Sequence, residues 1–241
     1  MDLNINNGCL SENKVELTDL RIKIDQLNTS IISGLKDRSR YTLNKDVFEK
    51  EFFDGMSWFL YRLKEEQNVD SKFGRFLYCE QHPFIFCQVI FSKKELSKSL
   101  VLRNANTNNN FFDLDLSKDI ITLYKNTLKQ LCKKGENIEC YGEVVKLDVN
   151  NILLINERTV GMGEQVANYK IENDPILATL KTAKEIQNKL INVDREKAVI
   201  AIMKDKAQKL DLDTKIITGF AKELIQITLK AETEFILRQQ R

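Results

Sequence analysis

The stretch Ile155–Lys170, INERTVGMGEQVANYK, decides how this chain folds and what it can bind. On a helix, at about 100° per residue, Leu154 and Ile155 flank Arg158 on one apolar arc. Arg158 therefore faces the core, where a cation is strongly unfavourable unless an internal carboxylate or an anionic ligand meets it. From this stretch alone, a structural ion pair and a bound anion both remain open.

The composition around this stretch favours helices. Hydrophobic residues make up 42% of the 241 positions, enough for a substantial core, and only nine glycines and two prolines interrupt the chain. No stretch shows the period-two alternation of a convincing strand pair. We therefore expect one all-α domain over residues 1–241, a multi-helix bundle in which residues 1–13 form a flexible leader.

Apolar residues that recur at steps of three and four predict eight or more helices. Gly74 is placed to end the second helix, and Asp213 to cap the last one. A turn into a short apolar helix is expected around Pro83, and a loop at the Asn-rich residues 104–110. The main helices are expected at 14–37, 55–70, 113 or 117 to 133, from 144 into the opening stretch, 177–189, 193–210 and 214–238.

Charge and cysteine usage limit the partners and the compartment. The net charge is +2, without long blocks of like charge, so neither nucleic acid nor an anionic membrane is an expected partner. No run approaches the 18 apolar residues of a membrane span, and the N-terminus MDLNINN lacks signal-peptide features. The cysteines are odd in number and lack a C-x-x-C pair, which indicates a reduced, cytoplasmic protein. They are Cys9, Cys79, Cys87, Cys132 and Cys140.

A single histidine, His82, restricts the chemistry further. It argues against Ser/His or Cys/His nucleophiles and against a multi-histidine metal site, so we interpret His82 as structural and expect no metal or cofactor. Arg21 lies on the first expected helix, and Arg38 directly follows it. Taken singly, each is interpreted as a solvated charge beside the core.

Four polar side chains repeat the unusual position of Arg158. Glu196 lies near the centre of the apolar face of helix 193–210, with Asn192 one turn earlier. Thr228 and Glu232, four positions apart, lie within the apolar arc of the last helix. Each of them alone is explained by a satisfied internal hydrogen bond.

Together with Arg21, Arg158 and Lys170, these four side chains predict a polar pocket inside a helical bundle. The excess of cations indicates an anionic ligand, and the glutamates among them indicate hydroxyl or ether oxygens to be bound. No nucleophile stands beside a base, so covalent catalysis is not expected.

Several segments, in this order along the chain, are similar to one known family. They are LTDLRIKIDQLNTSIISGLKDRSRY at 17–41, GRFLYCEQHPF at 74–84, VANYK at 166–170 and ITLKAETEFILR at 227–238. The second is similar to the family segment RRF-x-S-P-D-E-x-P-F, and the third to VAEAK. As an ordered set, they resemble the all-helical chorismate mutases of fungi and plants.

This resemblance implies an isomerase that rearranges chorismate to prephenate, in the shikimate pathway towards aromatic amino acids. It also implies the fold of that family, a homodimer and no cofactor. The Claisen step needs no nucleophile, but a flexible dianion must be held in its reactive conformer while charge on the ether oxygen is stabilised.

The resemblance assigns a role to each inward polar residue. The two arginines would grip the substrate carboxylates with help from the threonine, and the lysine and the glutamate of the last helix would bond the ether oxygen. The other glutamate and the asparagine would hold the ring hydroxyl. The implied catalytic residues are Arg21, Arg158, Lys170, Glu196 and Glu232, and the substrate-binding residues are Asn192 and Thr228.

One departure from the family concerns helical phase. The family spaces its arginine and lysine eleven apart, about 20° on a helix, whereas Arg158 and Lys170 are twelve apart, about 120°. We expect a π-type distortion at Gly161-Met162-Gly163 to absorb the extra residue. Two alternatives stay open: an inactive homologue that only binds or dimerises, and an enzyme resembling isochorismate pyruvate-lyases.

A second departure concerns regulation. Where the family's effector site has an arginine pair and a glycine-serine loop, this chain has Gly74-Arg75 and Gly142-Glu143. One cation is lost and one anion is gained, which disfavours an amino-acid carboxylate. We expect little response to tyrosine or tryptophan.

Overall fold

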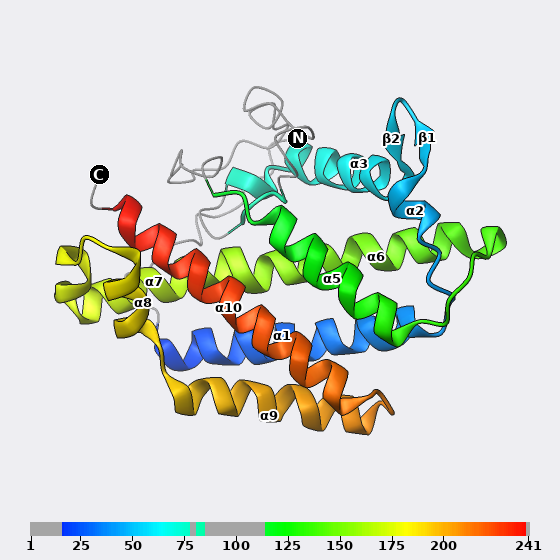
Figure 1. Cartoon of the computed structure of the whole chain (residues 1–241). Helices are drawn as coiled ribbons and strands as arrows, with labels where there is room; N and C mark the ends of the chain where they lie inside the picture. The colour runs from blue at the N-terminus through cyan, green and yellow to red at the C-terminus, as the bar shows by residue number, and fades with distance from the viewer. Residues whose placement is uncertain (1–15, 78–80, 85–113, 240–241) are drawn as a thin grey trace, which may run out of the picture.

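The computed structural model describes residues 16–77, 81–84 and 114–239, and these residues form an all-α bundle (Figure 1). The expected fold class is confirmed. The helices are α1 (Leu17–Ser39), α2 (Asp46–Glu49), α3 (Trp58–Lys72), α5 (Ser117–Leu131), α6 (Tyr141–Asn156), α7 (Met162–Asn173), α8 (Ala183–Leu190), α9 (Val193–Lys209) and α10 (Thr214–Arg238). Short 3-10 turns cover Arg75–Leu77, Ile138–Cys140 and Pro175–Thr179.

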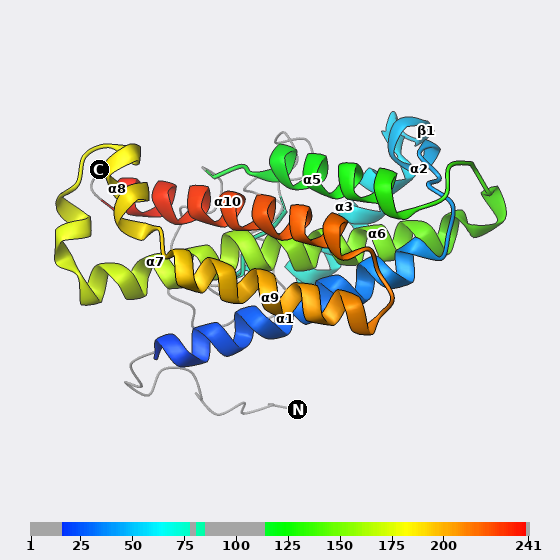
Figure 2. The same cartoon turned by 60° about the horizontal axis from the view of Figure 1, so that its bottom comes forward.

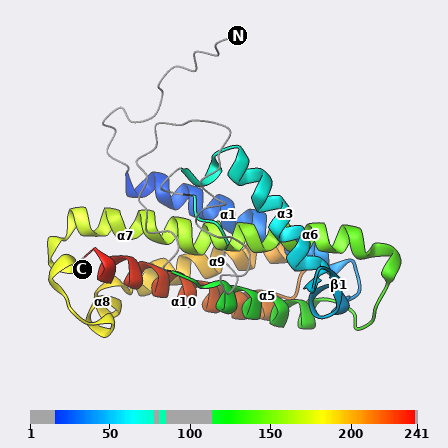
Figure 3. The same ribbon diagram turned by 90° about the horizontal axis from the view of Figure 1, so that it is seen from above.

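A long helical rod forms the axis of the bundle. It consists of α6, a π-helical turn at Glu157–Gly161 and α7, which run in one line across the molecule (Figure 3). Helices α1 and α10 pack along this rod, and α9 lies against both of them (Figure 2). Helix α8 covers the end of the bundle near the C-terminus, where Ile186 and Leu190 join a small apolar cluster.

The π turn confirms the expected distortion, although its position is earlier than expected. A Cβ atom on Gly163 would lie 3.1 Å from the Cβ atom of Ala231, so this glycine allows α7 to approach α10 closely. Gly163 belongs to regular helix α7, and the extra residue is absorbed in the preceding turn, Glu157–Gly161.

Helix ends agree with the expected signals in most places. Helix α10 has the expected bounds, and the Asp213 side chain caps it by accepting from the amides of Lys215 and Ile216. Gly74, with φ of 72°, follows the end of α3 as expected. The helix expected at 177–189 begins later, because Thr182 starts α8 with a capping box.

The expectation that no strand pair forms is wrong. Strands β1 (Glu51–Phe53) and β2 (Met56–Ser57) make a small antiparallel hairpin. Its turn residues Asp54 and Gly55 have φ of 47° and 73°. Asp-Gly is a sequence signal for such a turn, and the two strands are too short to show an alternating pattern.

Arg38 corrects another expectation, because it is fully buried and not solvated. Its Nε donates to Asp148 Oδ1 at 2.7 Å, and its terminal nitrogens donate to the carbonyls of Thr42 and Leu43. Tyr124 also donates its hydroxyl to Asp148 Oδ1, at 2.8 Å. This buried polar cluster joins α1, α5 and α6.

His82 has a structural environment. Its Nε2 contacts the carboxylate of Glu164, its carbonyl accepts from Asn156 Nδ2 at 2.9 Å, and its ring packs near Phe235. Expectations for residues 1–13, the segment after Phe84, the loop 104–110 and three of the cysteines lie outside the described residues. No helix among the described residues is long and apolar enough to cross a membrane.

Candidate functional site

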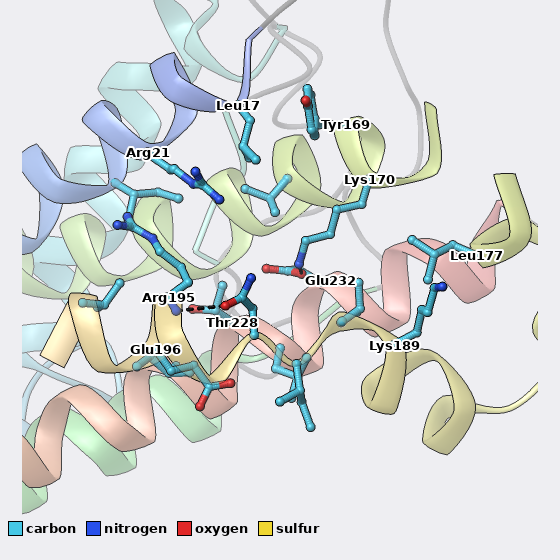
Figure 4. Close-up of a pocket in the computed structure, with 18 of the residues that line it drawn as sticks. Leu17, Arg21, Tyr169, Lys170, Leu177, Lys189, Arg195, Glu196, Thr228 and Glu232 are labelled. Atoms are coloured by element: carbon cyan, nitrogen blue, oxygen red, sulfur yellow. Dashed lines mark hydrogen bonds and ion pairs between the residues drawn. The ribbon is translucent and has the colours of Figure 1, made fainter. Parts of the chain in front are cut away.

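A cavity of about 370 Å³ opens between α1, α7, α9 and α10 (Figure 4). Its lining comes from segments that are far apart in the sequence, including the π turn and the start of α9. All seven of the expected site residues line it. They are Arg21, Arg158, Lys170, Asn192, Glu196, Thr228 and Glu232.

Arg158 enters the cavity from the π turn and is only 4% exposed. Its Nε donates to Asn28 Oδ1 at 2.9 Å and its Nη1 to Thr228 Oγ1 at 3.3 Å, and both acceptors are neutral. Burial lowers the pKa of Arg158 to about 10, which leaves it protonated at neutral pH. No carboxylate in the described part of the chain forms an ion pair with it, so the structural ion pair is ruled out there.

Lys170 reaches the same cavity from α7 and meets the last helix. Its Nζ donates to Glu232 Oε2 at 2.8 Å, and the two side chains face each other in Figure 4. Glu232 lies one turn after Thr228 on α10, as their spacing of four predicts. This places a carboxyl group that is 10% exposed beside an ammonium group that is 30% exposed in the cavity.

The π turn explains how Arg158 and Lys170 come to share this cavity. A π turn accommodates one residue more than an α turn, so the flanking α-helical segments keep their phase. The twelve-residue spacing then acts like one of eleven, about 20° instead of about 120° on a regular helix. The predicted convergence is confirmed by the presence of both side chains in the cavity lining.

The start of α9 departs from the expected inward orientation. Asn192 is exposed and caps the helix, because its Oδ1 accepts from the amide of Arg195 at 2.9 Å. Its side-chain amide group remains a donor at the edge of the cavity. Glu196 is half-buried and lines the cavity, and no described cation forms an ion pair with it.

Two further cations line the cavity and were missed in the sequence. Arg195 forms an ion pair with Asp25 of α1 at 3.0 Å, and Lys189 forms one with Asp174 at 3.1 Å. Each pair joins segments that are distant or separated by a loop, so helical spacing gives no sign of it. The sequence signal that could have identified Arg195 as a cavity residue was its position directly before Glu196.

Solved structures of chorismate mutases match this fold. The Aro7p enzyme of Candida albicans in complex with L-tryptophan has a TM-score of 0.79 at 20% identity, covering 92% of this chain and 91% of that one. AtCM1 with phenylalanine in its allosteric site has a TM-score of 0.80 at 19% identity, covering 96% and 99%. This chain has the chorismate mutase fold. The chloroplast enzyme of Zea mays agrees, with a TM-score of 0.78 at 18% identity and 95% and 97% coverage.

No protein-family model and no curated protein sequence matches the chain. The likeness to the chorismate mutase fold therefore rests on structure, at identities where sequence comparison alone finds little. It extends over nearly the full length of this chain and of the matched enzymes.

The residues at the expected effector positions, Arg75 on one side and Gly142 and Glu143 on the other, lie far from one another in this chorismate mutase fold. Arg75 forms ion pairs with Asp70 at 2.9 Å and with Glu157 at 3.7 Å, near the end of α6. Gly142 and Glu143 are exposed at the start of the same helix, about 22 Å from Glu157 at 1.5 Å per residue. Within one chain, these positions do not form a common site.

Proposed function

We propose that this protein is a chorismate mutase, an isomerase that converts chorismate to prephenate. The observation that carries the proposal is Arg158, a buried guanidinium that contacts only neutral groups among the described residues. A buried cation without a carboxylate is unfavourable unless an anion binds there. A substrate carboxylate would provide that anion.

The charges of the cavity support a dianionic substrate. Five cations and three carboxylates line it within the described part of the chain, and two of the cations have a lining carboxylate as their ion-pair partner. Arg21 and Arg158 have no such partner and enter the cavity from different elements. Two arginines in this arrangement suit two carboxylates on one ligand and would restrict it to a compact conformer.

Lys170 and Glu232 supply the electrostatic part of the proposed mechanism. As the bond to the ether oxygen breaks, negative charge grows on that oxygen, and prepositioned donors stabilise it. The Lys170 ammonium group donates directly. Glu232 donates only when protonated, because an ether oxygen accepts hydrogen bonds and donates none. Glu196 and Asn192, at the start of α9, would hold the ring hydroxyl.

The remaining lining is consistent with a reaction that needs no covalent intermediate. No serine, cysteine or histidine of the described residues lines the cavity, so a Ser/His or Cys/His nucleophile pair is not available there. Apolar side chains such as Ile24, Val166 and Val199 complete the walls and would exclude water from the ring.

Product analysis tests this proposal. Purified protein is incubated with chorismate, and prephenate is measured as its acid-catalysed product, phenylpyruvate. Prephenate formation well above the uncatalysed rate is expected. Pyruvate release from isochorismate would instead favour the lyase alternative, and loss of neither substrate would leave an inactive homologue.

The proposal also includes a homodimer in the cytoplasm, as the resemblance to fungal and plant enzymes implies. The proposal also includes weak regulation by aromatic amino acids. Arg75 is engaged by Asp70 and Glu157, and Glu143 stands where the family has a serine. An effector carboxylate would meet fewer free cations at these positions, so tyrosine and tryptophan should have little effect.

A further inference from the structure

Arg195 is a cavity residue that the seven expected site residues do not include. It belongs to the first turn of α9 and lines the cavity beside Glu196. Its Nη2 pairs with a single oxygen of Asp25 at 3.0 Å, and its side chain is 26% exposed. Its Nε and Nη1 have no hydrogen-bond partner among the described residues, and they remain free to donate to a ligand.

The partner of Arg195 brings it close to the other arginines. Asp25 lies one helical turn after Arg21 on α1, so the Arg195 guanidinium is held on the same side of the cavity as Arg21 (Figure 4). The charges of Asp25 and Arg195 also affect the pKa of Arg158. Burial has the largest effect and lowers its pKa, the charge of Glu232 raises it, the charge of Arg195 lowers it, and that of Asp25 raises it.

This side of the cavity has an excess of positive charge. Three guanidinium groups, from Arg21, Arg158 and Arg195, belong to this side, and two carboxylates, those of Asp25 and Glu196, accompany them. On the opposite side, the ammonium groups of the lining are each paired with a carboxylate. An anionic group of the ligand is therefore most strongly attracted to the space between α1, the π turn and α9.

We propose that Arg195 is a third substrate-binding arginine, which donates to a substrate carboxylate while Asp25 holds its guanidinium in place. The proposal rests on the proposed function for the identity of the substrate. Arg195 thereby determines specificity for a doubly charged ligand, and Asp25 is a positioning residue. The competing explanation is that the Asp25–Arg195 pair only fastens α1 to α9.

Two variants separate these explanations. Arg195→Gln removes the donor charge, and Asp25→Asn removes the ion pair but leaves the Arg195 charge available. We expect Arg195→Gln to raise the KM for chorismate roughly 10-fold or more, since a hydrogen bond to a charged group is lost. Asp25→Asn should raise the KM clearly less than Arg195→Gln does, because it releases the Arg195 guanidinium but leaves its charge in the cavity.

The matched control is Lys197→Gln, which removes one positive charge from the same helix. Lys197 pairs with Asp194 on the exposed surface at 3.9 Å. The KM of the Lys197→Gln variant should stay near that of the wild type. An unchanged KM in Arg195→Gln would overturn the proposal. Equal increases in KM in Arg195→Gln and Asp25→Asn, with equal losses of Tm, would also overturn it, because a simple fastening role predicts that result.

A binding measurement keeps this test independent of catalysis. If the wild type turns over no chorismate, the proposed function fails, and the role of Arg195 is decided with L-malate, a simple dicarboxylate. Millimolar malate should raise the Tm of the wild type and of Asp25→Asn, and it should not raise that of Arg195→Gln. Equal shifts in all three proteins, or no shift in the wild type, would overturn the role of Arg195.

Discussion

Arg158 and Lys170 are twelve residues apart on one continuous helical rod, and both line the same cavity. The π turn at Glu157–Gly161 makes this possible, because it absorbs one residue without changing the phase of the flanking helices. The relative orientation of these two side chains is thus set by a local irregularity of the backbone.

The first prediction changes the number of residues in this turn. Inserting one alanine after Val160 would rotate Lys170 by about 100° relative to Arg158, and chorismate turnover should fall roughly 100-fold or more. Deleting Val160 should convert the π turn into regular α-helix and keep the two side chains in phase. Turnover in the deletion variant should stay within roughly 10-fold of the wild type. Circular dichroism and Tm measure folding in both variants, and an active insertion variant would contradict the role of the π turn.

The second prediction concerns the hydrogen-bond donor that Glu232 is proposed to supply. Its Oε2 lies 2.8 Å from Lys170 Nζ, the other proposed donor. An ether oxygen accepts hydrogen bonds and donates none, so Glu232→Gln keeps a donor at this position and Glu232→Ala removes it. We expect kcat/KM to fall roughly 100-fold or more in Glu232→Ala and clearly less in Glu232→Gln. Equal losses in the two variants would reject the role.

The third prediction tests why Arg158 has neutral neighbours. Asn28→Asp would place a carboxylate where Arg158 Nε now donates to an amide oxygen at 2.9 Å. The new ion pair should compete with the substrate and raise the KM roughly 10-fold. Asn150→Asp adds the same charge at an exposed position of α6 and serves as the control. If both variants have the same KM, Arg158 does not bind the substrate through its charge.

The fourth prediction concerns stability and the buried pair of Arg38 and Asp148. Burial raises the pKa of Asp148 from 3.8 to about 6, although the Arg38 charge lowers it in part. A carboxyl whose pKa is higher in the folded state stabilises that state when it is protonated. Its contribution to the unfolding free energy is therefore complete below pH 3.8 and is lost as the pH rises through about 6. The wild type should therefore lose about 3 kcal/mol of unfolding free energy over this range relative to Asp148→Asn. Urea titrations of both proteins at several pH values measure the difference, and a constant difference would contradict the raised pKa.

Local patterns in the sequence predicted much of the fold, because helix periodicity and caps are local properties. The bounds of α10 and its Asp213 cap are examples. The capping box at Thr182 that delays α8, and the Asp-Gly turn between β1 and β2, are also local signals, but both were overlooked. Both signals are present in the sequence, as Thr182 with Glu185 three positions later and as Asp54-Gly55.

The candidate site was predictable where polar residues interrupt an apolar helical face, as Arg158 and Glu232 do. Partners from different helices were not predictable in this way. The pairing of Arg38 with Asp148 bridges 110 positions, and that of Arg195 with Asp25 bridges 170. Such contacts depend on how the helices pack, so Arg38 was misinterpreted as solvated and Arg195 was missed.

The most direct test of the central claim is the kcat/KM for chorismate of the wild type and of Arg158→Ala. Arg62→Ala, which removes an exposed arginine that pairs with Glu66 on α3, is the control. We predict measurable prephenate formation by the wild type and by the control, and a loss of roughly 100-fold or more in Arg158→Ala. A wild type that forms no prephenate, or an Arg158→Ala variant as active as the wild type, would contradict the assignment of this cavity as a chorismate mutase active site.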